Sequence, residues 1–327
     1  MSRLLLVILA LLAANTSAVS AQNDTRDMAW PAKSIRFIVP FPPGSATDTI
    51  ARVVAQKLSE ALGQQVVIDN RAGASGSIGA EMTARAAPDG YSLVLGTTST
   101  HAVAASVNSN LSYDPVKDFS PISLIGSSPY VVAVHPAVAA NDLKELIALA
   151  KATPGQLSYG SAGNASLAHL AGDLFSIMAG VKLNHVPYKS SALSVLDVLS
   201  GRIDLQFGSI APTLPHIRSG KLRALAVTGA TRLAALPAVP TVNESGLRGY
   251  EVSLWMGILA PAGTPAAIVS RLNRELIAIL GTAGIKDALV AQGVEPRPST
   301  PADFAAYIRA EIAKYRNVVK TAGIHVE

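Results

Sequence analysis

Hydrophobic positions in the first hundred residues follow two periods, one typical of strands and one typical of helices. Short apolar runs at 34–39, 65–69 and 91–96 predict strands. Apolar residues recur at helical spacing over 46–62, and a second helix is expected through 80–87. Strands that alternate with helices indicate βαβ units and a mainly parallel sheet.

The same alternation begins again after a strong strand predicted at 130–135. Helices are expected at 142–152 and after the loop that ends at Ser166, and a second strong strand at 252–259. Further strands are predicted at 157–160, 185–188, 203–207 and 222–227, and three final helices at 266–280, 285–292 and 301–321.

The two strong strands divide the chain. The simplest arrangement is that the chain crosses to a second lobe at the first of them and returns at the second. We therefore expect an α/β protein in which each lobe is a mainly parallel sheet flanked by helices and the two crossing strands form a hinge. The expected domains are 22–129 plus 252–327, and 130–251.

Small polar residues follow the strand ends, where parallel sheets bind their ligands. In the first such loop, Gly44 allows a sharp turn, and Ser45 and Thr47 stand at the start of a helix. Free N–H groups and a partial positive charge at a helix start suit a carboxylate or a phosphate. An ordinary connection capped by Thr47 or Asp48 explains the same residues without a ligand.

The first residues have the pattern of an export signal: Arg3, an apolar run over 4–14, and small residues up to Ala21. We expect cleavage after Ala21, so that residues 1–21 are a signal peptide and the mature protein is periplasmic. The apolar run is too short for a stable membrane anchor. The chain has no cysteine, which excludes disulfides, thiolate metal sites and a lipid-anchor cysteine.

Several function classes lose support from composition and spacing. The net charge of +5 includes no long basic run, and aromatic residues make up only 5%, which argues against nucleic acid as a partner. The spacing of Gly73, Gly76 and Gly79 is not that of a dinucleotide loop. The six histidines lack the spacing of a metal site, and G-x-S-x-G is missing. We expect no cofactor, no metal and no catalytic residues, with a secreted hydrolase as the weakest alternative.

Motifs along nearly the whole mature chain resemble those of one family. They are VPFPPGSATD at 39–48, PDGY at 88–91, YGSAGN at 159–164, HVPYK at 185–189, GKLRALAV at 220–227 and PTVNESG at 240–246. In content and order they resemble the Bug family, the periplasmic solute-binding receptors of tripartite tricarboxylate transporters.

The resemblance implies a type II periplasmic-binding-protein fold that closes on a small organic acid and delivers it, as a monomer, to membrane transporter subunits. It implies that loops of both lobes grip a carboxylate through amides, hydroxyls and water. The candidate binding residues are Phe41, Gly44, Ser45, Thr47, Asp48, Thr97, Thr98, Ser99, Ser161, Ala162, Gly163, Asn164, Ser166, Gly208 and Ser209. A periplasmic sensing module that passes the liganded state to a signalling protein is the alternative.

Six positions have competing interpretations. Ser45 stands where relatives often have a second glycine, and Gly208 where many carry an aspartate, which weakens an amino-acid ligand. Asn164 and Ser166 are good helix caps, and a cap needs no ligand. Arg71 is a natural carboxylate partner, although bracing its own glycine-rich loop is favoured. His169 fits packing or exposure better than ligand contact.

Overall fold

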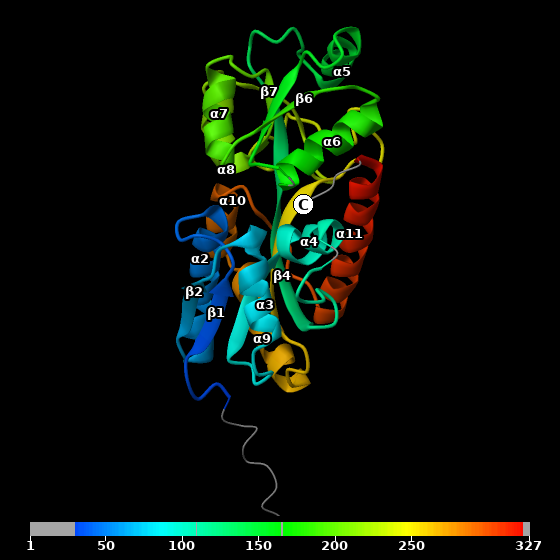
Figure 1. Cartoon of the computed structure of the whole chain (residues 1–327). Coiled ribbons are helices and arrows are strands. Elements are labelled where there is room, and N and C mark those ends of the chain that lie inside the picture. The colour runs from blue at the N-terminus through cyan, green and yellow to red at the C-terminus, as the bar shows by residue number, and fades with distance from the viewer. Residues whose placement is uncertain (1–29, 109, 165, 323–327) are drawn as a thin grey trace, which may run out of the picture.

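The computed structural model describes residues 30–108, 110–164 and 166–322, so the predicted signal peptide lies outside the described residues. Two lobes are stacked end to end (Figure 1). The helices α2, α3, α9 and α11 lie in the first lobe, and α5 to α8 lie in the second. Within the described part of the chain, none of the helices combines the length and apolar character needed to cross a bilayer.

In the first lobe, β1 (Ile35–Val39) pairs in parallel with β2 (Val66–Asn70) on one side and with β3 (Ser92–Thr97) on the other. The helices and turns of this lobe are α2 (Ala46–Leu62), η2 (Ala74–Gly76), α3 (Ser77–Ala84), the π-helical η3 (Ser99–Val103), α4 (Ala104–Val107), α9 (Ala266–Gly281), α10 (Ala283–Ala291) and α11 (Pro301–Ala322).

In the second lobe, β5 (Ser158–Ser161) pairs in parallel with β6 (Asn184–Pro187) and with β7 (Leu205–Ser209). The helices of this lobe are α5 (Leu143–Ala152), α6 (Leu167–Ala179), α7 (Ser191–Leu199) and α8 (Ile210–Arg218). Its remaining strand is β8 (Arg223–Val227). The three parallel strands of each lobe confirm the predicted βαβ units.

One 16-residue strand, β4 (Phe119–Val134), belongs to both lobes. Its first part pairs antiparallel with β9 (Ser253–Pro261) and with β10 (Glu295–Pro296). From Tyr130 onward it pairs antiparallel with β7 and β8. Strand β9 lies between β3 and β4, so the sheet order is β2-β1-β3-β9-β4-β7-β5-β6. The two-lobed α/β fold is confirmed, and the crossing strands add antiparallel pairs to it.

The cores follow from the alternation along the strands. Ile35, Phe37 and Val39 of β1 point to one face and pack with α2 and α9, whereas Ile38 points to the other face. Both faces are covered, which explains why the strands are apolar throughout. The core on the face of Ile38 continues through Trp255 at the crossing into the second lobe.

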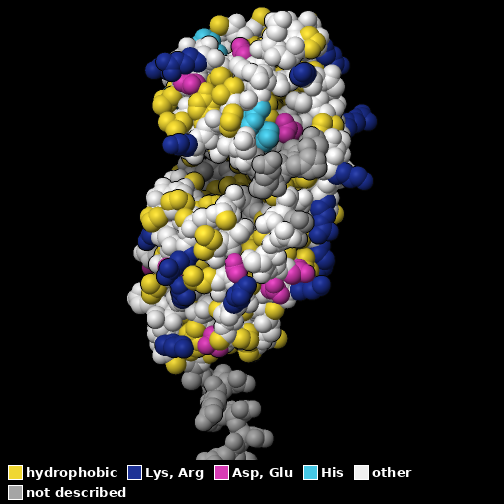
Figure 2. All heavy atoms as spheres, viewed as in Figure 1, with side chains coloured by type: hydrophobic (Ala, Val, Ile, Leu, Met, Phe, Trp, Pro, Cys, Tyr) yellow, Lys and Arg dark blue, Asp and Glu magenta, His cyan; other side chains and the backbone are white. Residues whose placement is uncertain are grey.

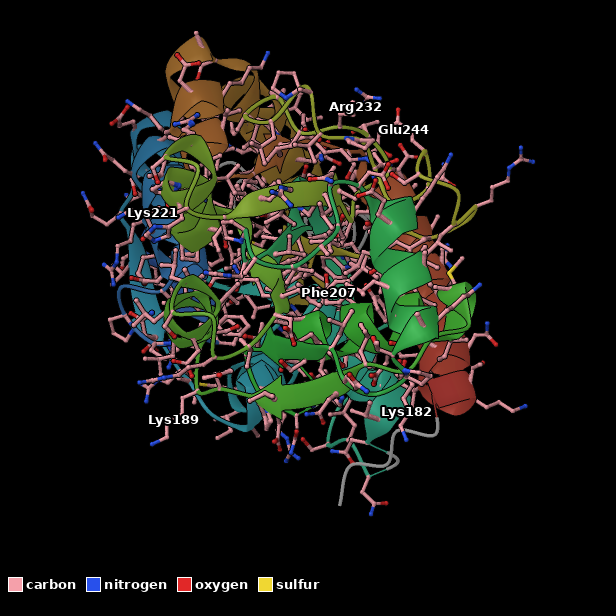
Figure 3. All side chains as sticks on the ribbon, turned by 90° about the horizontal axis from the view of Figure 1, so that it is seen from above. Lys182, Lys189, Phe207, Lys221, Arg232 and Glu244 are labelled. Carbon is pink, nitrogen blue, oxygen red and sulfur yellow. The ribbon has the colours of Figure 1, made fainter. Side chains whose placement is uncertain are left out.

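Aromatic rings fill the centre of the second lobe. Phe207 lies inside it in the view from above (Figure 3), with the centroids of Tyr159 and Phe175 each 5.6 Å from its own. Arg232 and Glu244 form an ion pair at the edge, with Arg232 Nε 2.9 Å from a Glu244 carboxylate oxygen (Figure 3). The centre of this lobe is therefore filled by packed rings, and any ligand-binding groups must lie at the strand ends.

Most predicted elements agree with the structure to within a few residues, including all three C-terminal helices. The first strong strand is longer than predicted and begins at Phe119 instead of residue 130. Pro121 and Pro129 make a strand over 119–129 hard to predict, because proline is unusual inside strands. A strand accommodates proline where its pairing is irregular, as it is at Pro121. The boundaries 22–129 plus 252–327 and 130–251 stay a prediction.

Candidate functional site

The carboxyl ends of the parallel strands in both lobes reach the level at which the chain crosses between the lobes. Thr97 ends β3, beside β9. Ser209 ends β7 and lies opposite Tyr130, which directly follows Pro129, the last residue of β4 that pairs with β9. Figure 2 shows the surface hollowed between the two lobes. Loops after these strand ends are therefore in position to line a shared site.

A small cavity of about 60 Å³ is lined by residues of both lobes. The first lobe contributes Thr47 at the start of α2, and the second contributes Ser209 and Ile210 at the start of α8. Tyr130 lines the cavity at the crossing, and burial raises the pKa of its phenol to about 12. Thr47 and Ser209 are predicted binding residues, whereas neither Tyr130 nor α8 was identified from the sequence.

The first-lobe loop turns sharply into α2. Gly44 has a φ of 78°, in the left-handed region that favours glycine. Ser45 caps the helix: its hydroxyl accepts the Asp48 N–H at 3.3 Å and lies 3.0 Å from the Thr47 hydroxyl. The cap is thus Ser45 and not Thr47 or Asp48, because only Ser45 combines extended backbone with this bond.

Asp48 is buried behind this loop and braces it. One carboxylate oxygen accepts the Gly44 N–H at 2.8 Å and the Arg52 Nε–H at 2.9 Å, and the other accepts the Asn70 amide at 2.8 Å. Burial raises the pKa of Asp48, but the bonds from Arg52, Asn70 and Gly44 outweigh it and hold the pKa below its ordinary value. The ionised carboxylate faces its own lobe, which favours a role in shaping the loop.

Threonines fasten the end of β3 to the returning strand. The buried Thr98 hydroxyl donates to the Ser253 carbonyl at 3.1 Å and accepts the Trp255 N–H at 2.8 Å. The Thr97 N–H donates to the Thr100 hydroxyl at 2.9 Å. A π-helical turn begins immediately afterwards at Ser99, and such turns are frequent at functional sites. The hydrogen bonds of Thr97 and Thr98 hold this end of the strand against the hinge.

The second-lobe loop is closed by Ser161. Its hydroxyl lies 2.6 Å from His185 Nε2 and accepts the Gly163 N–H at 3.1 Å. Ser166 caps α6 by accepting the N–H of His169 at 3.2 Å. The capping interpretation of Ser166 is therefore confirmed, whereas ligand contact by Ser161, Ser166 and the intervening Ala162, Gly163 and Asn164 stays a prediction.

Two histidines stack next to this loop, and their spacing along the chain does not indicate the contact. The ring centroids of His169 and His185 are 3.8 Å apart, with a 9° angle between planes. His169 Nε2 lies 3.2 Å from Asp173, which also accepts the Tyr159 O–H at 2.9 Å. Burial, followed by the charge of His169, lowers the pKa of His185 to about 4. Figure 2 shows histidine and acidic side chains together beside the hollow.

Gly208 leaves no room for an aspartate side chain. A Cβ at this position lies 2.6 Å from the Gln206 side-chain amide carbon and 2.8 Å from the Thr213 hydroxyl. Gln206 is fully buried and its amide donates to Thr213 at 3.1 Å, so an added side chain displaces a bonded group. This packing agrees with the weaker case for an amino-acid ligand.

Two cationic residues, Arg71 and Lys189, lie away from the cavity that both lobes line. Arg71 pairs with Asp69 of β2 at 2.9 Å, and bracing of its own glycine-rich loop stays a prediction. Lys189 is exposed and points away from the protein (Figure 3). Among the described residues, no group of three or more histidine, aspartate or glutamate side chains is placed to hold a metal ion. The site is therefore built from hydroxyls, amides and helix starts.

Comparisons with known proteins identify relatives of this fold and site. Residues 50–324 match the family model for the tripartite tricarboxylate transporter family receptor. The chain is 39% identical over 324 residues to Protein BugT of Bordetella pertussis, covering 99% of this chain and 98% of that protein.

Solved structures agree with this assignment. The structure of R. palustris Rpa4515 with adipate has a TM-score of 0.80 at 39% identity, covering 90% of this chain and 99% of that one. MatC (Rpa3494) from Rhodopseudomonas palustris with bound malate has a TM-score of 0.75 at 31% identity, covering 89% and 100%. The resemblance to Bug receptors is confirmed, and the chain belongs to the tripartite tricarboxylate transporter receptor family.

Proposed function

We propose that this protein is a periplasmic receptor that captures a small carboxylate between its lobes and delivers it to a tripartite tricarboxylate-type membrane transporter. The observation that carries the proposal is the cavity lined by Thr47 of one lobe and Ser209 of the other. Each residue stands at a helix start, where N–H groups and the helix dipole favour a negative charge. A carboxylate held there contacts both lobes at once.

Ligand binding favours the closed arrangement of the lobes because only that arrangement offers both sets of donors. Strand β4 runs without interruption from one lobe to the other, so bending of this strand and of β9 changes the angle between them. We propose the division at 129/130 and 251/252, a monomer, and cleavage of the export signal near Ala21 as parts of this model.

A dicarboxylate or a similar small organic acid is the proposed ligand class. Two relatives were solved with adipate and with malate. The cavity is lined mainly by apolar side chains and by the neutral polar side chains of Thr47, Tyr130 and Ser209, without an acidic residue to pair with a ligand amino group. The two carboxylates of such a ligand can each bind one loop, the first at the start of α2 and the second after β5.

The test is titration of the purified mature protein with adipate, malate and a series of mono- and dicarboxylates. Trp255 is buried at the hinge, whereas Trp30 lies beside Tyr91 in the first lobe, so a Trp30→Phe variant reports on the hinge alone. We expect saturable heat by calorimetry and a matching change in Trp255 fluorescence.

A Thr47→Val variant removes one hydroxyl at the cavity, and we expect it to weaken binding at least tenfold, since a lost hydrogen bond to a charged group costs about 1.5–3 kcal/mol. Thr321→Val, at an exposed position on α11, is the matched control. Binding of no carboxylate by the unmodified protein contradicts the proposal.

A hydrolase is the second candidate because Ser161 and His185 lie at 2.6 Å, the distance of a nucleophile and its base. Ser161 is only 1% exposed and its hydroxyl accepts the Gly163 N–H, which favours a bracing role instead. Incubating the protein with an ester of a bound carboxylic acid and measuring the released acid and alcohol by mass spectrometry distinguishes the two. Product formation that Ser161→Ala abolishes supports the hydrolase.

A further inference from the structure

Helix α11 has one face buried at the hinge and an exposed stripe whose charged residues are all cations. Its inner side packs against β4, η3 and α4 and reaches α6 of the second lobe. On its outer side, Arg309, Ala313, Arg316 and Lys320 follow one another at helical spacing. All four are exposed. We define these four residues as the α11 stripe.

The negative charges of this helix lie away from the stripe. Glu311 is buried on the inner side and pairs with Lys314. Asp303 lies in the first turn, where it accepts the Thr300 hydroxyl at 2.7 Å. Within the described residues, neither Arg309 nor Arg316 forms an ion pair. Figure 2 shows Lys and Arg side chains along the edge of the first lobe where α11 runs in Figure 1.

A groove of about 850 Å³ lies beside the stripe. Arg309 and Arg316 line one wall, with Ile312 as apolar surface between them, and the loop over 111–118 forms the other wall. The acids of that loop are engaged locally. Asp114 accepts the N–H groups of Val116 and Lys117 and pairs with the Lys117 ammonium at 3.5 Å, and Asp118 accepts the Asp114 N–H at 2.7 Å. Arg309, Arg316 and Lys117 line the groove together with these two aspartates, so its net charge is positive and favours an anionic group.

We propose that the α11 stripe and this groove form the surface on which the receptor docks an acidic segment of its membrane transporter. Charge complementarity selects an acidic partner, and the apolar floor with a wall on either side suits a protein segment better than a flat lipid surface. Because α11 contacts both the hinge strand β4 and α6, its outer face shifts when the lobes close. A partner bound there distinguishes the liganded receptor from the empty one. This proposal rests on the proposed transport function.

The test combines charge reversal with a matched control. Arg309→Glu/Arg316→Glu reverses two stripe charges, and Lys144→Glu/Lys286→Glu makes the same change in net charge at exposed positions of α5 and α10. We expect both double variants to bind adipate or malate as the unmodified protein does. In cells, we expect the stripe variant to lose at least nine-tenths of ligand uptake and the control to retain it.

A photo-crosslinker placed at Ala313 provides the second measurement. We expect a crosslink to a polytopic membrane protein of the transporter that strengthens with ligand and disappears in the stripe variant. Crosslinking to a second copy of the chain, or binding of phosphatidylglycerol vesicles that the stripe variant loses, overturns the proposal in favour of a dimer or a lipid surface. Uptake by the stripe variant equal to the control also overturns it. If the unmodified protein binds no carboxylate, the proposed function fails, while the crosslink still tests the docking surface.

Discussion

At the scale of single residues, the first-lobe loop owes its shape to a carboxylate that faces inward. Asp48 accepts bonds from Gly44, Asn70 and Arg52, and Ser45 supplies the helix cap. These hydrogen bonds hold the loop in one conformation. The direction of the backbone N–H groups at the start of α2 is therefore fixed by the loop. Ligand affinity in this lobe therefore depends on a residue that need not touch the ligand.

We expect Asp48→Ala to destabilise the protein by about 2–3 kcal/mol, because buried donors lose their acceptor. Carboxylate binding should weaken at least tenfold, because the Gly44 N–H loses its acceptor and the loop at the start of α2 loses its conformation. Chemical denaturation and calorimetry with adipate or malate measure the two effects. The exposed Asp287→Ala on α10 is the control. Unchanged stability and affinity in Asp48→Ala would contradict the bracing role.

Local chemistry of this kind could be predicted only in part. A small polar residue before an apolar helical pattern indicates a cap, and the structure confirms the helix start at Ala46. The stacked pair of His169 and His185 could not be predicted, because it depends on α6 lying across β6, a tertiary contact with no local signal. The cavity position of Tyr130 depends in the same way on the pairing of β4 with β7.

At the scale of elements, α11 joins the two lobes through a buried face that contains one carboxyl group. Glu311 is 4% exposed, near Glu251 and paired with Lys314. Burial raises the pKa of Glu311, and Lys314 only partly offsets it. A carboxyl group whose pKa rises on folding stabilises the folded state most at pH values below its unfolded pKa, and this contribution is lost as the pH rises through the folded pKa.

We therefore expect Glu311→Gln to raise the Tm at pH 7 by about 2 °C, since the variant removes an ionised group that folding disfavours. Near pH 3, well below the ordinary glutamate pKa of about 4.3, the carboxyl group is largely neutral in both states, and the two proteins should melt together. Scanning calorimetry at both pH values measures the difference. Glu60→Gln, on the exposed side of α2, should show no such gain. A lower Tm for Glu311→Gln at pH 7 would mean that its pair with Lys314 dominates.

Regular periodicity predicted most of the strands and helices, but the regular helix α7 was missed, as were irregular elements. Helix α8 contains Pro215 and was not predicted, although it places Ser209 at a helix start. The π-helical turn at Ser99 follows from hydrogen bonds between Thr97 and Thr100 that periodicity does not report. Both irregular elements border the candidate site, and departures from local sequence preferences are expected at functional sites.

At the scale of the whole molecule, one cavity connects residues far apart in the chain. Thr47 belongs to the first lobe and Ser209 to the second, and both line it. The other candidate loops follow strand ends at the same level. Because lobe closure is the proposed response to ligand, the separation between the starts of α2 and α8 is the quantity that reports it.

The chain contains no cysteine, so a Thr47→Cys/Ser209→Cys variant carries a unique pair of thiols. We expect a short bifunctional thiol reagent to join them, with a yield that rises at least threefold when adipate or malate is added, because ligand favours the closed form. Mass spectrometry measures the yield. The pair Gln56→Cys/Lys221→Cys, exposed and away from the cavity, is the control. A yield independent of every ligand that binds would contradict closure at this point.

The position of β9 has a consequence for biosynthesis. This strand lies between β3 and β4, yet it is made long after both, since residues 253–261 follow the whole of the second lobe. Until then, β3 and β4 have unpaired edges that invite association with other chains. The second lobe is contiguous from β4 to β8 and becomes complete earlier. A chain that ends before residue 253 therefore leaves the edges of β3 and β4 open, and at this stage it is most exposed to association with other chains.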